Sequence, residues 1–322
     1  MSDKSPPPPD SAARPAAAVG AWGYRSYREH LSDRFGALRI RKLCLNAGFT
    51  CPNLDGTVAT GGCAYCDNRG FVPRAADASD LRRQWDAGRA ALRRRHRRVD
   101  GFIAYFQAFS NTHGSPDRLR VLYDPLPALL PECVGVAIGT RPDCLGAEVL
   151  PVLDALAERT FLTVEIGLQS DRDAVLRGLN RGHDAAAFHA AIARCAGRGF
   201  ELCVHLILGL PGEGADAPER LGDLIAGLPV QSVKLHNLHA LQGTALGRAH
   251  QRGLLPMPDA EAHRAALGRL LPRLRPDQAV QRLIADAPDH LLASDPWCQD
   301  KQGFLRRLQH QRANHNRAFH AA

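Results

Sequence analysis

Short apolar runs alternate along this chain with longer segments whose apolar residues recur at helical spacing. The apolar runs predict six strands, at 38–45, 101–106, 133–138, 161–167, 201–208 and 230–236. Helices are predicted at 22–36, 79–96, 117–128, 146–157, 171–179, 184–197 and 216–227. Six strands in strict alternation with helices favour an α/β protein whose parallel sheet forms an open or closed β/α barrel.

The alternation of strands and helices ends near residue 240. Together with the composition of the first twenty residues, this limit divides the chain into three regions. Residues 1–20 are rich in proline and alanine and predict a disordered tail. Residues 21–240 are expected to form the barrel core. Residues 241–322 are expected to form a small C-terminal extension that covers one mouth of the barrel, with helices near 258–272 and 299–313.

Polar or glycine-rich residues follow every predicted strand. In β/α barrels the functional site is built at the carboxyl ends of the strands. The residues concerned lie in the segments 46–68, 107–113, 139–143, 167–170, 209–213 and 236–239. We therefore expect a functional site at this end of the barrel.

The segment after the first strand carries Cys51, Cys63 and Cys66, spaced C-x11-C-x2-C in a glycine-rich loop. This spacing is typical of metal or cluster ligands. A structural zinc site normally takes four protein ligands and would have to recruit Cys44, whereas an iron-sulfur cluster with three cysteines leaves one iron open. Three cysteines favour the cluster, although zinc and chance occurrence remain alternatives. Cys44 lies within a predicted strand and is expected to be a small buried hydrophobe rather than a ligand.

The composition bears on the compartment and the partner. The chain has 322 residues, nine cysteines and a formal net charge of +8. It has no signal peptide pattern and no apolar run of membrane-spanning length, so a cytoplasmic protein without membrane contact is expected. Eight arginines in the segment 82–98 are opposed there only by Asp86. This segment fits a phosphate-binding face for a nucleic acid and a solvated helix surface equally well.

Several motifs occur together in order: Cys-Pro-Asn-x-Asp-Gly-Thr, Gly-Gly-Cys-x-Tyr-Cys, Ile-Gly-Thr-Arg-Pro-Asp, Glu-x-Gly-Leu-Gln-Ser, Asn-Arg-Gly-His and Ile-Leu-Gly-Leu-Pro-Gly-Glu. Over roughly residues 22–310 the chain thereby resembles radical S-adenosylmethionine (SAM) proteins. The resemblance is to the bacterial YhcC/YtqA-like branch, which is related to the catalytic subunit of Elongator. It implies a partial (β/α)6 radical SAM barrel.

The resemblance also implies cofactors and site residues. Cys51, Cys63 and Cys66 would bind a [4Fe-4S] cluster whose open iron chelates SAM. The residues that match SAM contacts of the family are Tyr65, Gln107, Asn111, Thr112, Gln169, Arg181, Gly209 and Pro211. Two departures concern this set: Gly139 stands where the Elongator pattern has a glutamate, and His205 stands where other relatives have an aspartate.

The implied reaction is reductive cleavage of SAM to methionine and a 5′-deoxyadenosyl radical, driven by a one-electron donor such as flavodoxin or ferredoxin. Glu165, Lys234, His236 and His239 lie near the expected mouth and are the candidate catalytic residues for proton transfer. Elongator-like relatives imply tRNA as partner, with modification of the wobble uridine. The alternatives are a small-molecule or protein substrate, and a non-catalytic iron-sulfur or zinc protein that acts as a sensor.

Overall fold

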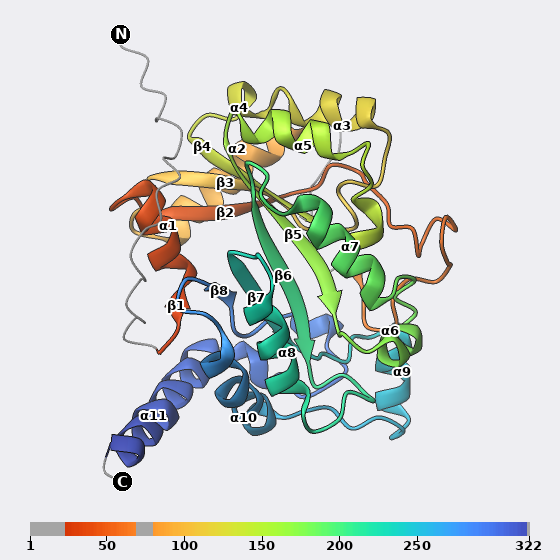
Figure 1. Ribbon diagram of the computed structural model, residues 1–322, viewed down its shortest axis with the longest axis vertical. Helices are drawn as coiled ribbons and strands as arrows, with labels where there is room; N and C mark the ends of the chain where they lie inside the picture. Colours follow the sequence, from red (N-terminus) through yellow and green to blue (C-terminus); the bar gives the residue numbers. More distant parts are fainter. Residues whose placement is uncertain (1–22, 69–79, 321–322) are drawn as a thin grey trace.

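A computed structural model describes residues 23–68 and 80–320, the last nine of these as backbone only. The predicted tail at 1–20 lies outside the described residues. Eight parallel strands form one curled sheet in the order β1-β8-β7-β6-β5-β4-β3-β2 (Figure 1). The strands are β1 (Arg25–Ser26), β2 (Ile40–Leu45), β3 (Gly101–Phe106), β4 (Cys133–Thr140), β5 (Phe161–Gln169), β6 (Glu201–Leu208), β7 (Ser232–Asn237) and β8 (Ala279–Arg282).

Helices follow the strands and cover the outer face of the sheet (Figure 1). They are α1 (Tyr27–Phe35), α2 (Leu81–Arg95), α3 (Pro116–Tyr123), α4 (Leu126–Leu129), α5 (Leu150–Ala157), α6 (Asp173–Gly178), α7 (Ala185–Cys195), α8 (Ala217–Gly227), α9 (Ala245–Gln251), α10 (Ala260–Leu270) and α11 (Lys301–His320). No helix among the described residues is long and apolar enough to cross a membrane.

The expected partial β/α barrel is confirmed, and the six expected strands are β2 to β7. Two further strands were not expected. β1 has only two residues, and β8 has four residues without a clear period, which is too short for the apolar pattern to reveal. β8 lies beyond residue 240, so the region expected to be an extension also contributes a strand to the sheet.

The two faces of the sheet have different chemistry. Apolar side chains on the outer face pack under the helices in one large core, for example Leu43 and Leu45 of β2. At the amino end of the lumen, α1 closes the half-barrel because Leu31 packs on Ile40 and Phe161. Ser26 begins this helix with a capping box to Glu29. Toward the carboxyl end the lumen becomes polar and charged.

Three register shifts interrupt the sheet. Between β3 and β4, Phe102 pairs with Cys133 but Ile103 pairs with Gly135. Between β5 and β6, Gly167 pairs with His205 but Gln169 pairs with Leu206, and Gln169 has a positive φ of 75°. Between β7 and β8, Val233 pairs with Val280 but Lys234 pairs with Arg282. An extra residue redirects the side chains that follow it, and such bulges are frequent beside functional sites.

A buried histidine anchors the C-terminal region to the barrel. His263 of α10 is 2% exposed, stacks near Trp297 and Phe304, and its Nε2 lies 2.9 Å from the carbonyl oxygen of Leu283. Burial lowers the pKa of His263 to about 4. The folded protein therefore keeps this imidazole neutral at a pH where the unfolded chain already binds a proton.

The expected result is a loss of stability on acidification. Because the pKa of His263 is lower in the folded state, its contribution is complete above pH ~6.5 and is lost as the pH falls toward about 4. Between these two pH values the free energy of unfolding of the wild type should fall with pH more steeply than that of H263Q. The two slopes should differ by at most about 1.4 kcal/mol per pH unit. Urea unfolding at several pH values measures this slope. His189 is exposed, and H189Q should leave the slope unchanged; equal slopes for H263Q and the wild type would contradict the assignment.

Candidate functional site

A cavity of about 760 Å³ lies at the carboxyl ends of the strands. Residues from the segments after β2, β3, β4, β5 and β7 line it, and β6 contributes His205 and Ile207 from within the strand. This end of the barrel therefore gathers polar side chains, as expected. Cys51, Cys63 and Cys66 all contribute to its wall. The cavity is within the range of volumes that protein ligand sites occupy.

The cysteine loop is held by its own backbone and by a buried asparagine. The amide of Leu54 donates to the carbonyl of Cys51 at 2.7 Å, and the amide of Cys66 donates to that of Cys63 at 3.0 Å. The side chain of Asn53 is fully buried and donates to Cys63 Sγ at 3.5 Å. Burial, together with the neighbouring Cys63, raises the pKa of the Cys66 thiol to about 12. Thiolates in this setting therefore need a positive partner such as a metal ion.

Two arginines lie beside the cysteines. Arg181 donates from Nη1 to Cys63 Sγ at 3.5 Å and from Nη2 to the carbonyl oxygen of Gly167 at 2.7 Å. Arg141 is 2% exposed and donates from Nε and Nη2 to Asp143, at 2.9 and 2.7 Å. Arg141 Nη1 and Arg181 Nε are buried and have no hydrogen-bond partner among the described residues. Two guanidinium groups with spare donors beside three thiols fit an anionic cluster and the carboxylate of SAM.

The structure brings four of the remaining cofactor candidates to the same cavity. Tyr65, Gln107, Gln169 and Arg181 all line it. Gln169 reaches it through the bulge at the end of β5 and its left-handed backbone. Gly139 also lines the cavity, where a Cβ would lie 3.1 Å from the carbonyl oxygen of Phe106.

The structure does not bring Asn111 and Thr112 to the cavity. Asn111 is 1% exposed, and its amide donates to the carbonyl oxygens of Phe106, Ala108 and Gly139 at 2.9 to 3.0 Å. Thr112 bonds to Thr140 and to the carbonyl oxygen of Cys144, both at 2.6 Å. These side chains shape the loop after β3, and their contact with SAM stays a prediction.

Gly209 and Pro211 are likewise outside the wall of this cavity. Gly209 instead lines a smaller cavity of about 350 Å³ that Pro258 also borders. The φ of Gly209 is +87°, and a Cβ there would lie 2.4 Å from Pro258 Cγ. Pro258 therefore excludes a side chain at this position, while contact of SAM with the backbone of Gly209 and Pro211 stays a prediction. Ile207, two residues earlier, does line the main cavity.

Replacing Gly209 with alanine is expected to destabilise the fold by about 2–4 kcal/mol, through a strained left-handed residue and a clash with Pro258. Gly253 is the matched control, because its φ is +72° but a Cβ there has no neighbour within 4 Å. G253A should cost about 1–2 kcal/mol. Chemical denaturation of both variants measures the difference, and equal losses would show that Pro258 does not restrict this position.

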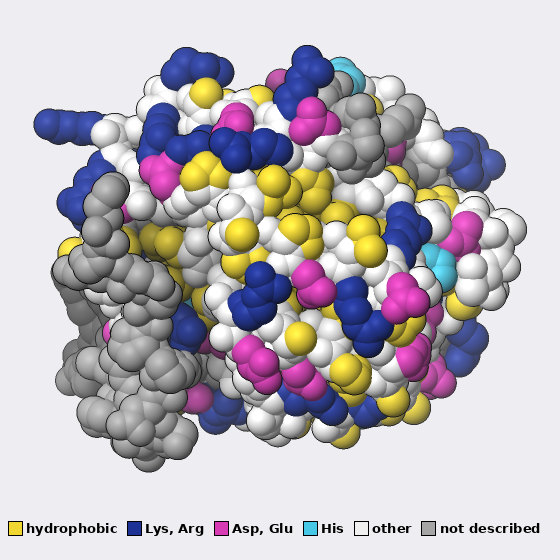
Figure 2. Space-filling model, turned by 90° about the horizontal axis from the view of Figure 1, so that it is seen from above, with side chains coloured by type: hydrophobic (Ala, Val, Ile, Leu, Met, Phe, Trp, Pro, Cys, Tyr) yellow, Lys and Arg dark blue, Asp and Glu magenta, His cyan; other side chains and the backbone are white. Residues whose placement is uncertain are grey.

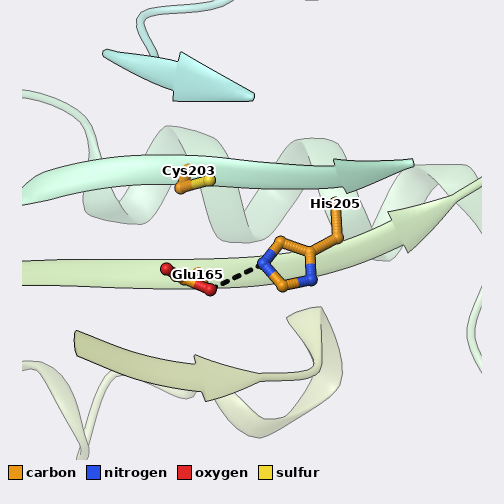
Figure 3. A group of neighbouring side chains, drawn as sticks. All are labelled: Glu165, Cys203 and His205. Atoms are coloured by element: carbon orange, nitrogen blue, oxygen red, sulfur yellow. Dashed lines mark hydrogen bonds and ion pairs between the residues drawn. The ribbon is translucent and has the colours of Figure 1, made fainter. Parts of the chain in front are cut away.

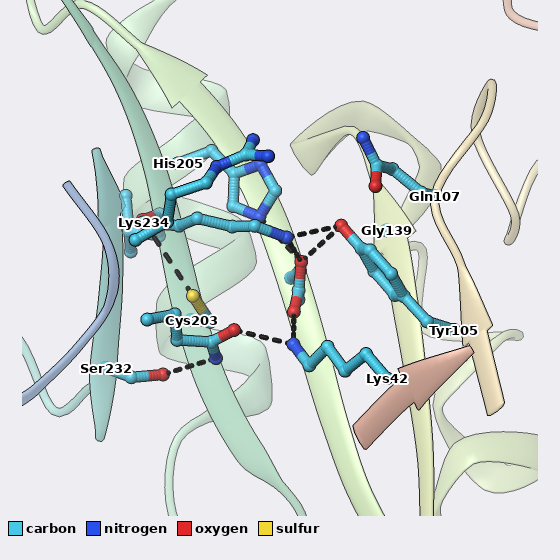
Figure 4. Close-up of polar contacts among 12 residues, drawn as sticks. Lys42, Tyr105, Gln107, Gly139, Cys203, His205, Ser232 and Lys234 are labelled. Carbon is cyan, nitrogen blue, oxygen red and sulfur yellow. Dashed lines mark hydrogen bonds and ion pairs between the residues drawn. The ribbon is translucent and has the colours of Figure 1, made fainter. Parts of the chain in front are cut away.

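A buried carboxylate organises the polar part of the lumen (Figure 4). Glu165 is 1% exposed. Its Oε1 accepts from Lys42, and its Oε2 accepts from Tyr105 at 2.7 Å, from His205 at 2.8 Å and from Lys234 at 2.9 Å. Lys234 also donates to the hydroxyl of Tyr105 at 2.6 Å. Five strands thus supply one connected group, which we call the Glu165 cluster: Lys42, Tyr105, Glu165, His205 and Lys234.

The protonation states within the Glu165 cluster follow from burial and charge. Burial opposes ionisation of Glu165, but Lys234 and Lys42 outweigh it and hold the pKa of this carboxyl well below its ordinary value. Burial lowers the pKa of Lys234 to about 8 and that of His205 to about 4. For Lys42, attraction to Glu165 outweighs burial and raises the pKa. At neutral pH the cluster therefore holds one carboxylate, two ammonium groups and a neutral imidazole.

The four catalytic candidates lie together at the inner end of the cavity. Glu165 and Lys234 contact each other in the Glu165 cluster. His236 accepts from Arg282 at 2.9 Å, and His239 lies 3.5 Å from the Asn237 amide and 3.9 Å from Cys298 Sγ. Glu165, His236 and His239 line the cavity, while Lys234 lies behind this wall. The structure thus brings these four together, and their catalytic role stays a prediction.

Glu165, Cys203 and His205 also form a geometric trio whose ligand atoms lie within 4.8 Å of one another (Figure 3). The surrounding charge argues against a metal there. Lys42 and Lys234 already neutralise Glu165 and would repel a cation. The loop cysteines are therefore the better candidate for metal binding.

Cys44 agrees with one expectation and departs from the other. It does not line the cavity with the three loop cysteines, as expected for a residue that is not a ligand. It is exposed, however, so the expectation of a buried hydrophobe is wrong. Because Lys42 of the same strand points into the lumen and strand side chains alternate, Cys44 shares that face, 4.0 Å from Gln107 Oε1.

The arginine-rich segment is partly neutralised, and much of it lies away from the cavity. Carboxylates pair with Arg82, Arg89, Arg93 and Arg98. Arg83, Arg94, Arg95 and Arg97 are exposed and form no ion pair within the described residues. Arg98 pairs with Asp100, which is bonded to Arg39 at the amino ends of β2 and β3. The end of this segment therefore lies opposite the cavity. On the face in Figure 2, Lys and Arg side chains are interspersed with Asp and Glu.

Several residues at the site carried no recognisable motif. Lys42 and Tyr105 lie within strands. Side chains in a strand point alternately to the two faces of the sheet, and only this alternation could have indicated that both residues face the lumen. Arg141 belongs to a recognisable motif. The burial of its Nη1 donor without a hydrogen-bond partner, however, depends on tertiary contacts that the sequence does not show. Arg282 was missed because β8 was missed.

Comparisons with known proteins agree with this geometry. Residues 56–225 match the family described as the radical SAM superfamily, and residues 230–313 match the Radical_SAM C-terminal domain. The chain belongs to the radical SAM superfamily and is a radical SAM enzyme by that membership. The superfamily implies a [4Fe-4S] cluster and SAM as cofactors.

Particular relatives confirm the branch that the motifs indicated. The chain is 35% identical over 280 residues to YtqA of Bacillus subtilis (strain 168), which covers 86% of each protein. It is 33% identical over 272 residues to YhcC of Escherichia coli (strain K12), covering 84% of this chain and 86% of YhcC. Among solved structures, Elp3 of the archaeon Methanocaldococcus infernus has a TM-score of 0.60 at 15% identity, which shows a shared fold. That match covers 84% of this chain and 63% of the archaeal one.

Proposed function

We propose that this chain binds a [4Fe-4S] cluster through Cys51, Cys63 and Cys66 and cleaves SAM reductively. The observation that carries the proposal is one cavity of about 760 Å³ that contains all three cysteines and both Arg141 and Arg181. When bound, the reduced cluster would supply the electron that generates a 5′-deoxyadenosyl radical from SAM. A flavodoxin or ferredoxin would supply that electron in the cell.

The protein residues have separate tasks in this proposal. Arg181 and Arg141 would hold negative charge beside the cysteines, with their unpaired Nε and Nη1 donors. Tyr65, Gln107 and Gln169 would orient SAM from three sides of the cavity. The neutral His205, fixed by its hydrogen bond to Glu165, and Lys234, with a pKa of about 8, would be available for proton transfer.

The proposed substrate is tRNA, modified at the wobble uridine. The resemblance to the Elongator branch supports this assignment, as does the formal net charge of +8. The four exposed arginines without ion pairs, Arg83, Arg94, Arg95 and Arg97, would contact phosphates along the outside of α2. They do not lie at the cavity, so they would contribute affinity rather than place the reacting base.

Anaerobic reconstitution with iron and sulfide, followed by dithionite and SAM, tests the chemistry. About four irons per chain and formation of 5′-deoxyadenosine are expected. A full cluster without SAM cleavage would instead support a non-catalytic iron-sulfur sensor. Zinc without sulfide would support a structural site and contradict the proposal.

A deletion strain tests the substrate. Nucleoside mass spectrometry of its tRNA should show the loss of one modified uridine, restored by the wild-type gene and not by the C63S variant. In gel shifts, tRNA affinity should fall steeply with salt, and replacing Arg83, Arg94, Arg95 and Arg97 with glutamine should reduce that salt dependence. Unchanged tRNA nucleosides in the deletion strain would remove tRNA as the substrate.

A further inference from the structure

The lumen of the barrel carries more positive than negative charge. Lys42, Lys234 and Arg282 project from β2, β7 and β8, and Glu165 is the carboxylate that faces them. Glu201, also in the lumen, is paired with His30 at the end closed by α1. His205 and His236 are neutral, because burial lowers the pKa of both. Within the described residues, Glu165 is shared by two lysines, and no carboxylate pairs with Arg282.

Arg282 reaches the lumen because of the bulge in β8. Lys234 pairs with Arg282 where regular pairing would give Gln281. Both consecutive side chains consequently face inward: Gln281 accepts from Lys42 at 2.6 Å, and Arg282 contacts His236 at 2.9 Å. A bulge that adds an arginine to a lumen already rich in cations weakens the fold electrostatically. Such a feature is more readily explained by a ligand than by stability.

The guanidinium of Arg282 has donors to spare. Its Nη2 donates to the neutral ring of His236, and its buried Nε has no hydrogen-bond partner within the described part of the chain. His236 lines the main cavity and Arg282 lies directly behind it, so a ligand would reach the guanidinium past the His236 ring. A guanidinium with unused donors in such a setting fits a carboxylate or phosphate, which it can bind through two parallel hydrogen bonds.

This position is separate from the arginines near the cysteines. Arg181 contacts Cys63, and Arg141 lies close to Asn53 of the cysteine loop, around Gly182. Arg282 instead lies against His236 on the β7–β8 side and affects the pKa of His239. The barrel therefore has two guanidinium positions: Arg141 and Arg181 in the cavity wall at the cysteine loop, and Arg282 behind His236 on the C-terminal strands.

We propose that Arg282, placed in the lumen by the bulge of β8, binds one oxyanion group of the substrate, a carboxylate or a phosphate. The assignment rests on the proposed function, because it places the substrate in the same cavity as SAM. A carboxylate would come from a small molecule or a carboxylated nucleoside, whereas a phosphate would come from a nucleotide.

Equilibrium dialysis of the reconstituted protein with SAM bound tests this site, because SAM then occupies the cysteine side of the cavity. The probes are labelled acetate and labelled inorganic phosphate. One of them should bind once per chain with a dissociation constant on the order of 1 mM. Preference for acetate would indicate a carboxylate in the substrate, and preference for phosphate would indicate a phosphate. Absence of saturable binding of both anions to the wild type overturns the proposal.

Three variants assign the binding to Arg282. Arg282→Gln should weaken it about tenfold or more, and Arg282→Lys about threefold, because lysine keeps the charge but loses the forked geometry. Arg273→Gln removes an exposed arginine paired with Asp223 and should bind as the wild type does. Circular dichroism and iron content verify folding; if R282Q does not fold, R282K decides. Wild-type affinity in the folded Arg282 variants overturns the proposal.

Failure of the proposed function gives a different result. Suppose that the wild type forms no 5′-deoxyadenosine but binds an anion, and that the Arg282 variants lose this binding. The anion site is then supported and the radical chemistry is not. If the wild type cleaves SAM and binds neither anion, the chemistry stands and the role of Arg282 is excluded.

Discussion

Replacing Cys63 with serine is expected to abolish SAM cleavage and to lower the iron content of the reconstituted protein far below about four per chain. Cys63 is one of three thiols at the cavity and accepts hydrogen bonds from both Asn53 and Arg181. Two remaining thiolates cannot hold the cube, because cysteine sulfur is the ligand that these clusters use. Iron and sulfide analysis and the yield of 5′-deoxyadenosine measure the effect, which should exceed about a thousandfold in rate.

Cys195 provides the matched control. It is also buried, but it lies in α7 within the outer core and does not border the cavity. C195A should retain iron, sulfide and SAM cleavage. Normal cluster content in C63S, or equal loss in both variants, would show that the loop cysteines are not the ligands.

Replacing Glu165 with glutamine is expected to destabilise the fold by about 3–5 kcal/mol, because Lys42 and Lys234 would lose their shared counter-charge in the lumen. Tyr105 and His205 would lose a charged acceptor at the same time. Thermal or urea unfolding of the cluster-free protein measures this loss independently of cofactor binding.

A surface carboxylate and a second substitution test the reason for this loss. Glu132 pairs with Arg89 and Arg93 at the surface, so E132Q should change the free energy of unfolding by at most about 1 kcal/mol. Adding Lys234→Met to E165Q should restore part of the stability, because one uncompensated ammonium is removed. Wild-type stability of E165Q would mean that the Glu165 cluster does not depend on its charge balance.

The six longer strands, of six to nine residues, were accessible from sequence because apolar residues recur along each of them. β3 and β6 were expected with the bounds that the structure has, and β5 extends two residues beyond the prediction because its bulged end continues to Gln169. β8 could not be found in this way, since its four residues include Gln281 and Arg282. Its place in the sheet depends on pairing with β7, which no local pattern encodes.

For the candidate site, too, local motifs could be found from the sequence and long-range contacts could not. The cysteines, Gln169 and Arg181 lie in local motifs, and they meet at one cavity. Asn111 and Thr112 were assigned by their position after β3, but their side chains are used by backbone carbonyls and by Thr140. Gly209 was assigned because it follows a strand, and Pro258, forty-nine residues later, fills the space that a side chain at this position would take. Long-range packing decided both cases.

The strand order has a mechanical consequence for this half-barrel. β1 and β2 are the two ends of the sheet and are not hydrogen-bonded to each other. Across that seam, the described residues include the Lys42 to Gln281 side-chain bond and the packing of α1 on Ile40. Separating the two ends therefore breaks no backbone ladder, and the wall can widen there at far lower free-energy cost than between any two paired strands.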